Sequence, residues 1–131
     1  MAVREACATY RSKTRDPRPG AGYTGTGAQD DEVVGAPGAI RALDPATGDT
    51  RWDFPIHEGS SAAGVLATGG GVLFAASHDG YLIALDAING KLLWRYQTGG
   101  SIHSSPISYA VDGKQYIAIA AGSTLITFGL P

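Results

Sequence analysis

The side chains that could carry chemistry in this sequence are few, and their spacing matches no metal or nucleophile site. Three histidines are expected in loops or turns: His57, His78 and His103. Their spacing is not that of a zinc ligand set, so we interpret them as solvated side chains and predict no metal site. The single cysteine, Cys7, provides one thiol, which forms neither an internal disulfide nor a metal site.

Two further patterns look like functional motifs but lack the elements that such motifs need around them. Residues 20–25 read Gly-x-Gly-x-x-Gly, yet no strand precedes them and no helix follows, so we predict no dinucleotide site there. Ser104 and Ser105 stand before Pro106 at the start of an expected strand, without the strand–turn–helix context of a nucleophile elbow. We therefore expect no catalytic residue in this chain.

The carboxylates with the clearest pattern are Asp44 and Asp86, which hold the same place in two copies of Ala-x-Asp-x-x-x-Gly-x-x-x-Trp. The copies lie 42 positions apart, and residues 38–52 align without a gap to residues 80–94. Six positions are identical: Gly38/Gly80, Ala42/Ala84, Leu43/Leu85, Asp44/Asp86, Gly48/Gly90 and Trp52/Trp94. Both tryptophans of the chain fall in register, so the motif is an internal repeat.

Each position of the motif has a structural explanation. The alanines are small where strands pack closely, the aspartates can accept hydrogen bonds from turn amides, and the glycines permit a positive φ. Trp52 and Trp94 are expected to stack flat against a neighbouring unit of the repeat, and to be largely buried in equivalent positions. The alternative is that Asp44 and Asp86 perform acid–base catalysis. Because both aspartates repeat with the fold, we favour the structural role.

The elements that carry these motifs are predicted to be short antiparallel strands. One group is expected at 62–68, 71–77, 81–87 and 91–98, and its Asp-Gly and Asn-Gly turns allow positive φ at both central residues. Four such strands in about 42 residues make one blade of a β-propeller, so the predicted fold class is all-β. Partial blades are expected on both sides, with strands at 38–43, 50–56, 105–111, 115–122 and 124–130.

The predicted organisation is a propeller fragment over residues 38–131 after an irregular segment over residues 1–37. The fragment has one full blade at about 62–98 and partial blades at 38–56 and 105–130. The first 37 residues are rich in glycine and proline and contain an acidic run, which favours irregular chain.

Composition excludes several classes of protein. A hydrophobic content of 44% is too high for a disordered chain, and a net charge of −2 gives no reason to expect nucleic-acid binding. No apolar run approaches the ~20 residues of a membrane-spanning helix. The first 13 residues lack the apolar core of a secretory signal, so we expect no signal peptide in this chain.

The repeated motif resembles the tryptophan-docking motif of pyrroloquinoline quinone (PQQ) repeat propellers, through Ala42, Asp44, Gly48 and Trp52 and through Ala84, Asp86, Gly90 and Trp94. Beyond the motif, residues 38–131 resemble the carboxy-terminal part of quinoprotein alcohol dehydrogenases, which are eight-bladed propellers. The matching stretches are 63–68, 79–87, 93–94, 97–99, 106–109 and 111–120.

This resemblance implies a periplasmic parent enzyme that oxidises an alcohol or sugar with PQQ and calcium and passes electrons to a haem protein or a quinone. In that family the calcium ligands and the catalytic base come from earlier blades, so they have no counterpart here. Gly64 and Val65 match the innermost strand nearest the axis and are the candidate cofactor contacts, although Gly64 also fits a packing role. We expect the chain alone to bind neither PQQ nor calcium and to be inactive.

Two other interpretations stay open at this point. One is a PQQ-like propeller without enzymatic activity that binds proteins as a scaffold, as in outer-membrane assembly lipoproteins. The other is a truncated product with no activity of its own. The expected partners are the remaining propeller blades, or further copies of the chain joined through open strand edges.

Overall fold

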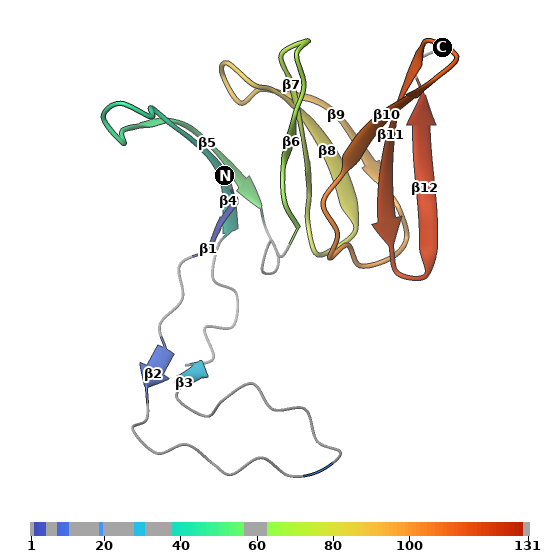
Figure 1. Cartoon of the computed structure of the whole chain (residues 1–131). Helices are drawn as coiled ribbons and strands as arrows, with labels where there is room; N and C mark the ends of the chain where they lie inside the picture. Colours follow the sequence, from blue (N-terminus) through green and yellow to red (C-terminus); the bar gives the residue numbers. More distant parts are fainter. Residues whose placement is uncertain are drawn as a thin grey trace.

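The computed structural model describes residues 2–4, 8–10, 19, 28–30, 38–56 and 63–129. These residues form twelve strands in four separate antiparallel sheets (Figure 1). The predicted all-β fold class is therefore confirmed. No helix within the described part of the chain is long and apolar enough to cross a membrane.

The central sheet has four strands in sequence order: β6 (Leu66–Ala67), β7 (Val72–Ala76), β8 (Tyr81–Asp86) and β9 (Leu92–Gln97). These are the strands expected at 62–68, 71–77, 81–87 and 91–98, each shortened at its ends. β6 is the shortest, and the start of its expected range, position 62, lies outside the described residues. Each strand pairs with the next along the chain, as the short turns require.

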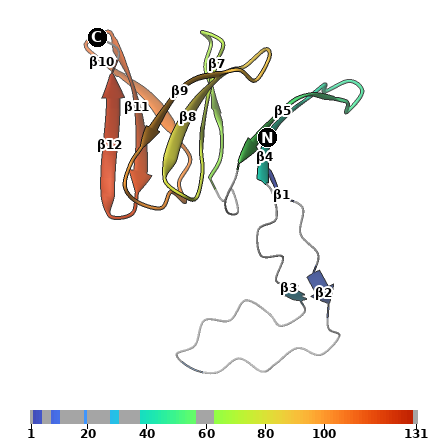
Figure 2. The same cartoon turned by 180° about the vertical axis from the view of Figure 1, so that it is seen from behind.

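Two further sheets stand on either side of the central one (Figures 1 and 2). The carboxy-terminal sheet comprises β10 (Ile107–Val111), β11 (Lys114–Ala121) and β12 (Thr124–Gly129). The amino-terminal sheet contains β4 (Gly38–Leu43) and β5 (Thr50–Ile56), with the bounds that the sequence predicts.

The expectation of irregular chain over residues 1–37 is wrong for three short stretches. β1 (Ala2–Arg4) pairs with β4, and β2 (Ala8–Tyr10) pairs with β3 (Ala28–Asp30). The pairing of β1 has a physical reason, because the edge of β4 away from β5 presents N–H and C=O groups that need partners. The amino-terminal sheet consequently has the order β1-β4-β5.

The turns differ from the expectation in one respect. Only Asp112-Gly113, between β10 and β11, has both central residues at positive φ, 50° and 77°, as a type I′ turn requires. In Asp79-Gly80 and Asn89-Gly90 the glycine alone is positive, at 91° and 72°. Within the described ranges Asp112 is the single non-glycine residue in this region of φ. The other two turns therefore use only their glycine for the left-handed position.

The core consists of two layers of buried side chains, one on each face of the central sheet. Alternation along β8 sends Leu82 to one face and Ile83 and Leu85 to the other. Leu82 joins the cluster shared with the carboxy-terminal sheet, which also contains Ala63, Ala76, Ile102, Ile119 and Ala121. Ile83 and Leu85 join the cluster shared with the amino-terminal sheet, which also contains Ile40, Ile56 and Ala75. β8 is thus buried on both faces.

Candidate functional site

The two motif copies fold into hairpins with the same register. Ala42 pairs with Trp52, Ala84 pairs with Trp94, and the register shifts directly after each alanine. The small alanine side chain opposite each tryptophan leaves room for the indole on that face of the sheet. The repeat in the sequence is therefore a repeat in backbone geometry, including the same β-bulge.

The motif aspartates are held inside their turns. A carboxylate oxygen of Asp44 accepts the N–H of Ala46 at 2.9 Å, and one of Asp86 accepts the N–H of Ile88 at 2.8 Å. The hydrogen bond from Ala46, together with one from Arg51, holds the pKa of Asp44 below its ordinary value. For Asp44 these contacts favour an ionised carboxylate that closes its turn, rather than a general acid or base.

Trp52 connects the amino-terminal sheet to the turn between β8 and β9. Its indole Nε1–H donates to the carbonyl of Ala87 at 3.2 Å. The ring lies over Gly90, where an added Cβ atom would stand only 2.6 Å from Cε3 of the indole. Glycine is therefore required at position 90 for two reasons: its φ is 72°, and a side chain there would collide with the indole.

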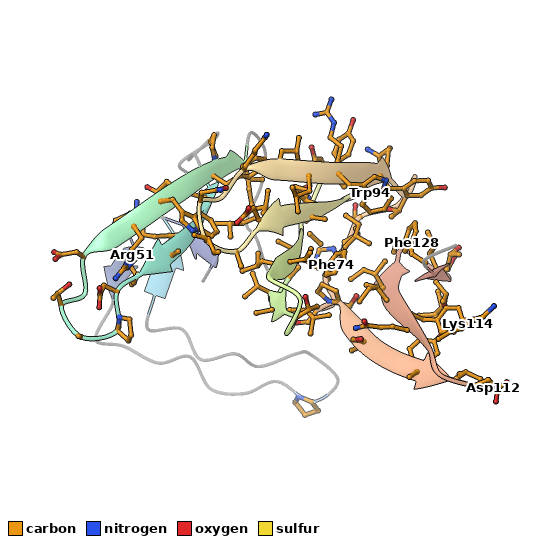
Figure 3. The ribbon with its side chains drawn as sticks, turned by 90° about the horizontal axis from the view of Figure 1, so that it is seen from above. Arg51, Phe74, Trp94, Asp112, Lys114 and Phe128 are labelled. Atoms are coloured by element: carbon orange, nitrogen blue, oxygen red, sulfur yellow. The ribbon has the colours of Figure 1, made fainter. Side chains whose placement is uncertain are left out.

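The expectation that Trp52 and Trp94 are buried alike is wrong. Trp52 is partly buried between two sheets, whereas Trp94 remains 40% exposed. Trp94 stacks on Tyr96 with ring centres 6.0 Å apart. It also lies edge to face with Phe128, with ring centres 5.3 Å apart (Figure 3). The turn that would cover Trp94, by analogy with Ala87–Gly90, would follow β12, and β12 is the last strand among the described residues.

This difference leads to a prediction for the two tryptophans. Trp52→Ala should lower the free energy of unfolding by about 2–4 kcal/mol, because it removes a packed indole and leaves the Ala87 carbonyl without its donor. Trp94→Ala should cost roughly 1–2 kcal/mol, because its ring is less covered. Urea unfolding of both variants at one protein concentration measures the difference. An equal or larger loss of stability for Trp94→Ala would contradict the conclusion that the Trp52 ring is the more closely packed of the two.

Gly64 and Val65 lie just before β6, where the central and carboxy-terminal sheets meet. The N–H of Gly64 donates to Oγ of Ser105 at 3.0 Å, and a Cβ atom on Gly64 would stand 2.3 Å from that oxygen. Val65 packs against the cluster shared with the amino-terminal sheet. A contact of either residue with a cofactor stays a prediction. The sequence did not predict the contact between Gly64 and Ser105, because the two residues are 41 positions apart in the chain.

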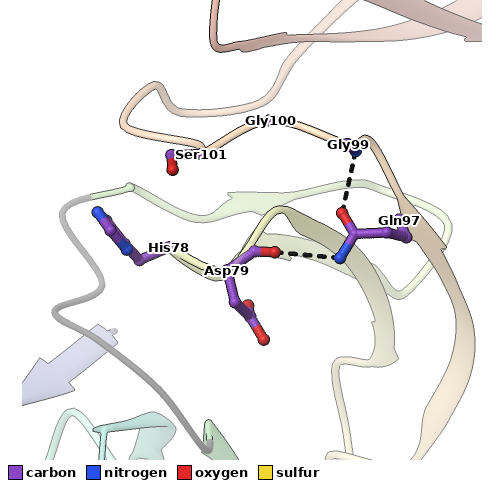
Figure 4. A pocket seen from close by; sticks show the side chains of 6 residues that line it. All are labelled: His78, Asp79, Gln97, Gly99, Gly100 and Ser101. Carbon is purple, nitrogen blue, oxygen red and sulfur yellow. Dashed lines mark hydrogen bonds between the residues drawn. The ribbon is translucent and has the colours of Figure 1, made fainter.

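A shallow polar pocket of about 290 Å³ opens between the β7–β8 turn and the segment after β9 (Figure 4). Its lining residues are His78, Asp79, Gln97, Gly99, Gly100 and Ser101. Gln97 spans the two segments: its Nε2 donates to the carbonyl of Asp79 at 3.1 Å, and its Oε1 accepts the N–H of Gly99 at 3.0 Å.

The structure brings together two histidines that the sequence spacing did not connect. The rings of His78 and His103 meet edge to face, with centres 4.8 Å apart and planes at 77°. Over the described ranges there is no group of three or more His, Cys, Asp or Glu side chains placed to hold a metal ion. Arg41 and Asp53, opposite each other on β4 and β5, form an ion pair that lowers the pKa of Asp53.

Comparison with known proteins identifies relatives of this structure. Residues 36–129 match a family model of PQQ-type repeats described as outer membrane protein assembly factor BamB. The chain is 42% identical over 108 residues to a quinoprotein ethanol dehydrogenase of Pseudomonas aeruginosa, covering 79% of this chain and 16% of the relative. It is 36% identical over 91 residues to methanol dehydrogenase [cytochrome c] subunit 1 of Paracoccus denitrificans, covering 70% and 14%.

A solved structure shows the same architecture. The quinohemoprotein alcohol dehydrogenase of Comamonas testosteroni superposes with a TM-score of 0.65 at 31% identity, over 75% of this chain and 15% of that one. The chain therefore spans about one sixth of the length of the dehydrogenases that it matches.

Proposed function

Because this chain belongs to the PQQ-repeat β-propeller family, we propose that it forms the carboxy-terminal blades of a quinoprotein dehydrogenase that oxidises an alcohol or a sugar with PQQ and calcium. The observation that carries this proposal is the 42% identity over 108 residues with a quinoprotein ethanol dehydrogenase. Identity at that level extends well beyond the docking motif, which specifies only the repeat.

The described residues alone do not fit calcium, because they contain no group of three or more His, Cys, Asp or Glu side chains placed to hold a metal ion. Ser105 occupies the side of Gly64 on which a Cβ atom would stand, so that side offers no room for a cofactor. No catalytic step follows from these residues. We propose instead that the calcium ligands and the base lie on other blades. Gly64 and Val65, just before β6, would then border the cofactor from the innermost strand.

The whole protein would work in the periplasm and pass its electrons to a haem protein or a quinone. A relative named for cytochrome c and a solved quinohemoprotein support a haem acceptor. The chain would complete its ring through the remaining blades, or through other copies that cover its open edges. β12 supports this, because one of its edges has no partner strand among the described residues.

A scaffold that binds proteins without catalysis is the second candidate. The observation in its favour is the description of the matching family model, which names an outer-membrane assembly factor. The two candidates differ in a measurable way, because only a dehydrogenase segment can replace its counterpart in an active quinoprotein.

The test is a chimera in which residues 38–129 replace the matching segment of the Pseudomonas aeruginosa quinoprotein ethanol dehydrogenase. We expect the chimera to reduce an electron-accepting dye with ethanol in a manner that depends on PQQ and calcium. We expect no turnover from the 131-residue chain alone. The matched control carries Gly90→Val, which should block the Trp52 contact and abolish the activity of the chimera.

Two results would overturn parts of the proposal. A chimera that folds, as judged by circular dichroism and thermal unfolding, but fails to bind PQQ would favour the scaffold. Turnover by the chain alone that rises with added PQQ would show that it assembles a working site without other blades.

A further inference from the structure

Among the described residues, the side chains of His78 and His103 lie in contact. The proposed propeller role does not use them, and imidazole is a common metal ligand. Both side chains are exposed, and their ring centres are 4.8 Å apart. They come from different connections of the sheet: His78 from the β7–β8 turn and His103 from the segment between β9 and β10. The polar pocket of Figure 4 lies directly beside His78.

The distance between the rings suits a shared metal ion. Two imidazoles bound to one zinc ion through Zn–N bonds of about 2.0–2.1 Å have ring centres roughly 5 Å apart. Imidazole nitrogen is a preferred ligand of zinc, copper and nickel. The ring centres are already at this separation, 4.8 Å, but the rings must turn out of their edge-to-face contact so that one nitrogen of each faces the ion.

The backbone on both sides of the pair is fixed. The turn that carries His78 is closed by hydrogen bonds from Ser77 N–H to the carbonyl of Tyr81, at 2.9 Å, and from Gly80 N–H to the carbonyl of Ser77, at 3.0 Å. A ligand on such a hydrogen-bonded turn loses little backbone entropy when it binds an ion.

His103 is equally restrained by its neighbours. Ile102, directly before it, is completely buried in the core. Ser104, directly after it, donates its hydroxyl to the carbonyl of Ala120 at 3.0 Å and accepts the N–H of Ala120 at 3.1 Å. The side chain of His103 is therefore presented from a fixed point on the same end of the sheets as His78.

From this geometry we propose that His78 and His103 form a two-histidine site for a divalent transition metal ion such as Zn²⁺ or Cu²⁺. The remaining coordination positions of the ion are filled by water and face the polar pocket beside His78. The site is independent of the proposed PQQ and calcium chemistry, because hard cations such as calcium take oxygen ligands. It leaves the ion open to an additional small ligand.

The experiment is calorimetric titration of the whole chain with ZnCl₂, CuSO₄ and CaCl₂. We expect Cu²⁺ to bind more tightly than Zn²⁺ and Ca²⁺ not to bind at this site. His78→Gln and His103→Gln should each weaken Zn²⁺ binding by about tenfold or more, because the second imidazole binds an ion that is already tethered. The double variant should bind Zn²⁺ with an affinity within about twofold of that of either single variant, because removal of one histidine already abolishes chelation by the two rings.

His57→Gln is the matched control, because it removes the third histidine of the chain. It should leave the affinity for Zn²⁺ unchanged. Histidine-ring NMR signals of the unaltered chain provide a readout that does not depend on folding of the variants: Zn²⁺ should shift the signals of His78 and His103 and not that of His57. Equal weakening by His57→Gln, unshifted signals of the pair, or an unaltered chain that binds no better than the double variant would overturn the proposal.

Discussion

Gly90→Ala is expected to lower the free energy of unfolding by about 2–4 kcal/mol, the same range as for Trp52→Ala. A side chain at a φ of 72° costs roughly 1 kcal/mol or more in backbone strain. The new Cβ atom would also stand 2.6 Å from the Trp52 indole, and such overpacking typically adds about 1–3 kcal/mol. Urea unfolding at a fixed protein concentration measures the loss.

The repeat supplies a matched control for this prediction. Gly48 has a φ of 80° in the equivalent turn between β4 and β5, but a Cβ atom there would meet nothing within 4 Å. Gly48→Ala should therefore cost only the strain, about 1 kcal/mol. In a Trp52→Ala background the cost of Gly90→Ala should fall to that of Gly48→Ala. A cost that stays the same without the indole would show that the two sheets are not joined through this contact.

Leu82→Ala should lower the free energy of unfolding by about 2–5 kcal/mol, the range for large-to-small changes in a packed core. Leu82 is fully buried on β8 and packs with Ile102 and Ile119 where the central and carboxy-terminal sheets meet. Leu125→Ala is the control, because Leu125 on β12 is 71% exposed and its loss should change stability by less than about 0.5 kcal/mol. Urea unfolding of the two variants under the same conditions measures both effects. Equal effects of the two substitutions would contradict the assignment of this core.

Local sequence patterns predict much of this fold. The 42-residue offset predicts two equivalent hairpins, and Ala42–Trp52 and Ala84–Trp94 pair identically. The short turns predict the strand order of the central sheet, because a turn of a few residues leaves the next strand no other neighbour. Elements that depend on nearby residues were therefore predicted well.

Features that depend on distant residues could not be predicted from local sequence patterns. β1 is very short and pairs with β4 across a long stretch of chain, so no local pattern marks it as a strand. The 40% exposure of Trp94 could not be predicted, because its motif is indistinguishable from that of Trp52. The sequence motif specifies a tryptophan that can dock, and the neighbouring turn determines whether it does.

The candidate site divides in the same way. The hydrogen bonds of Asp44 and Asp86 lie within their own turns, so the motif predicts them. The contact between Gly64 and Ser105 and the contact between His78 and His103 connect separate sheet segments. They arise because connections far apart in the sequence lie at the same end of adjacent sheets, which the spacing of the residues does not reveal.

The separation of the sheets has an energetic consequence. Backbone ladders run only within each sheet, so the described sheets hold one another mainly through side chains, at the Trp52–Gly90 contact and the two buried clusters. Stability in such an array is close to a sum of intrinsic terms and nearest-neighbour coupling terms, as in a one-dimensional Ising chain. Weakening one coupling then lowers the stability of the sheets that it joins and makes the unfolding of the array less cooperative. The docked Trp52 therefore contributes cooperativity between neighbouring sheets as well as stability.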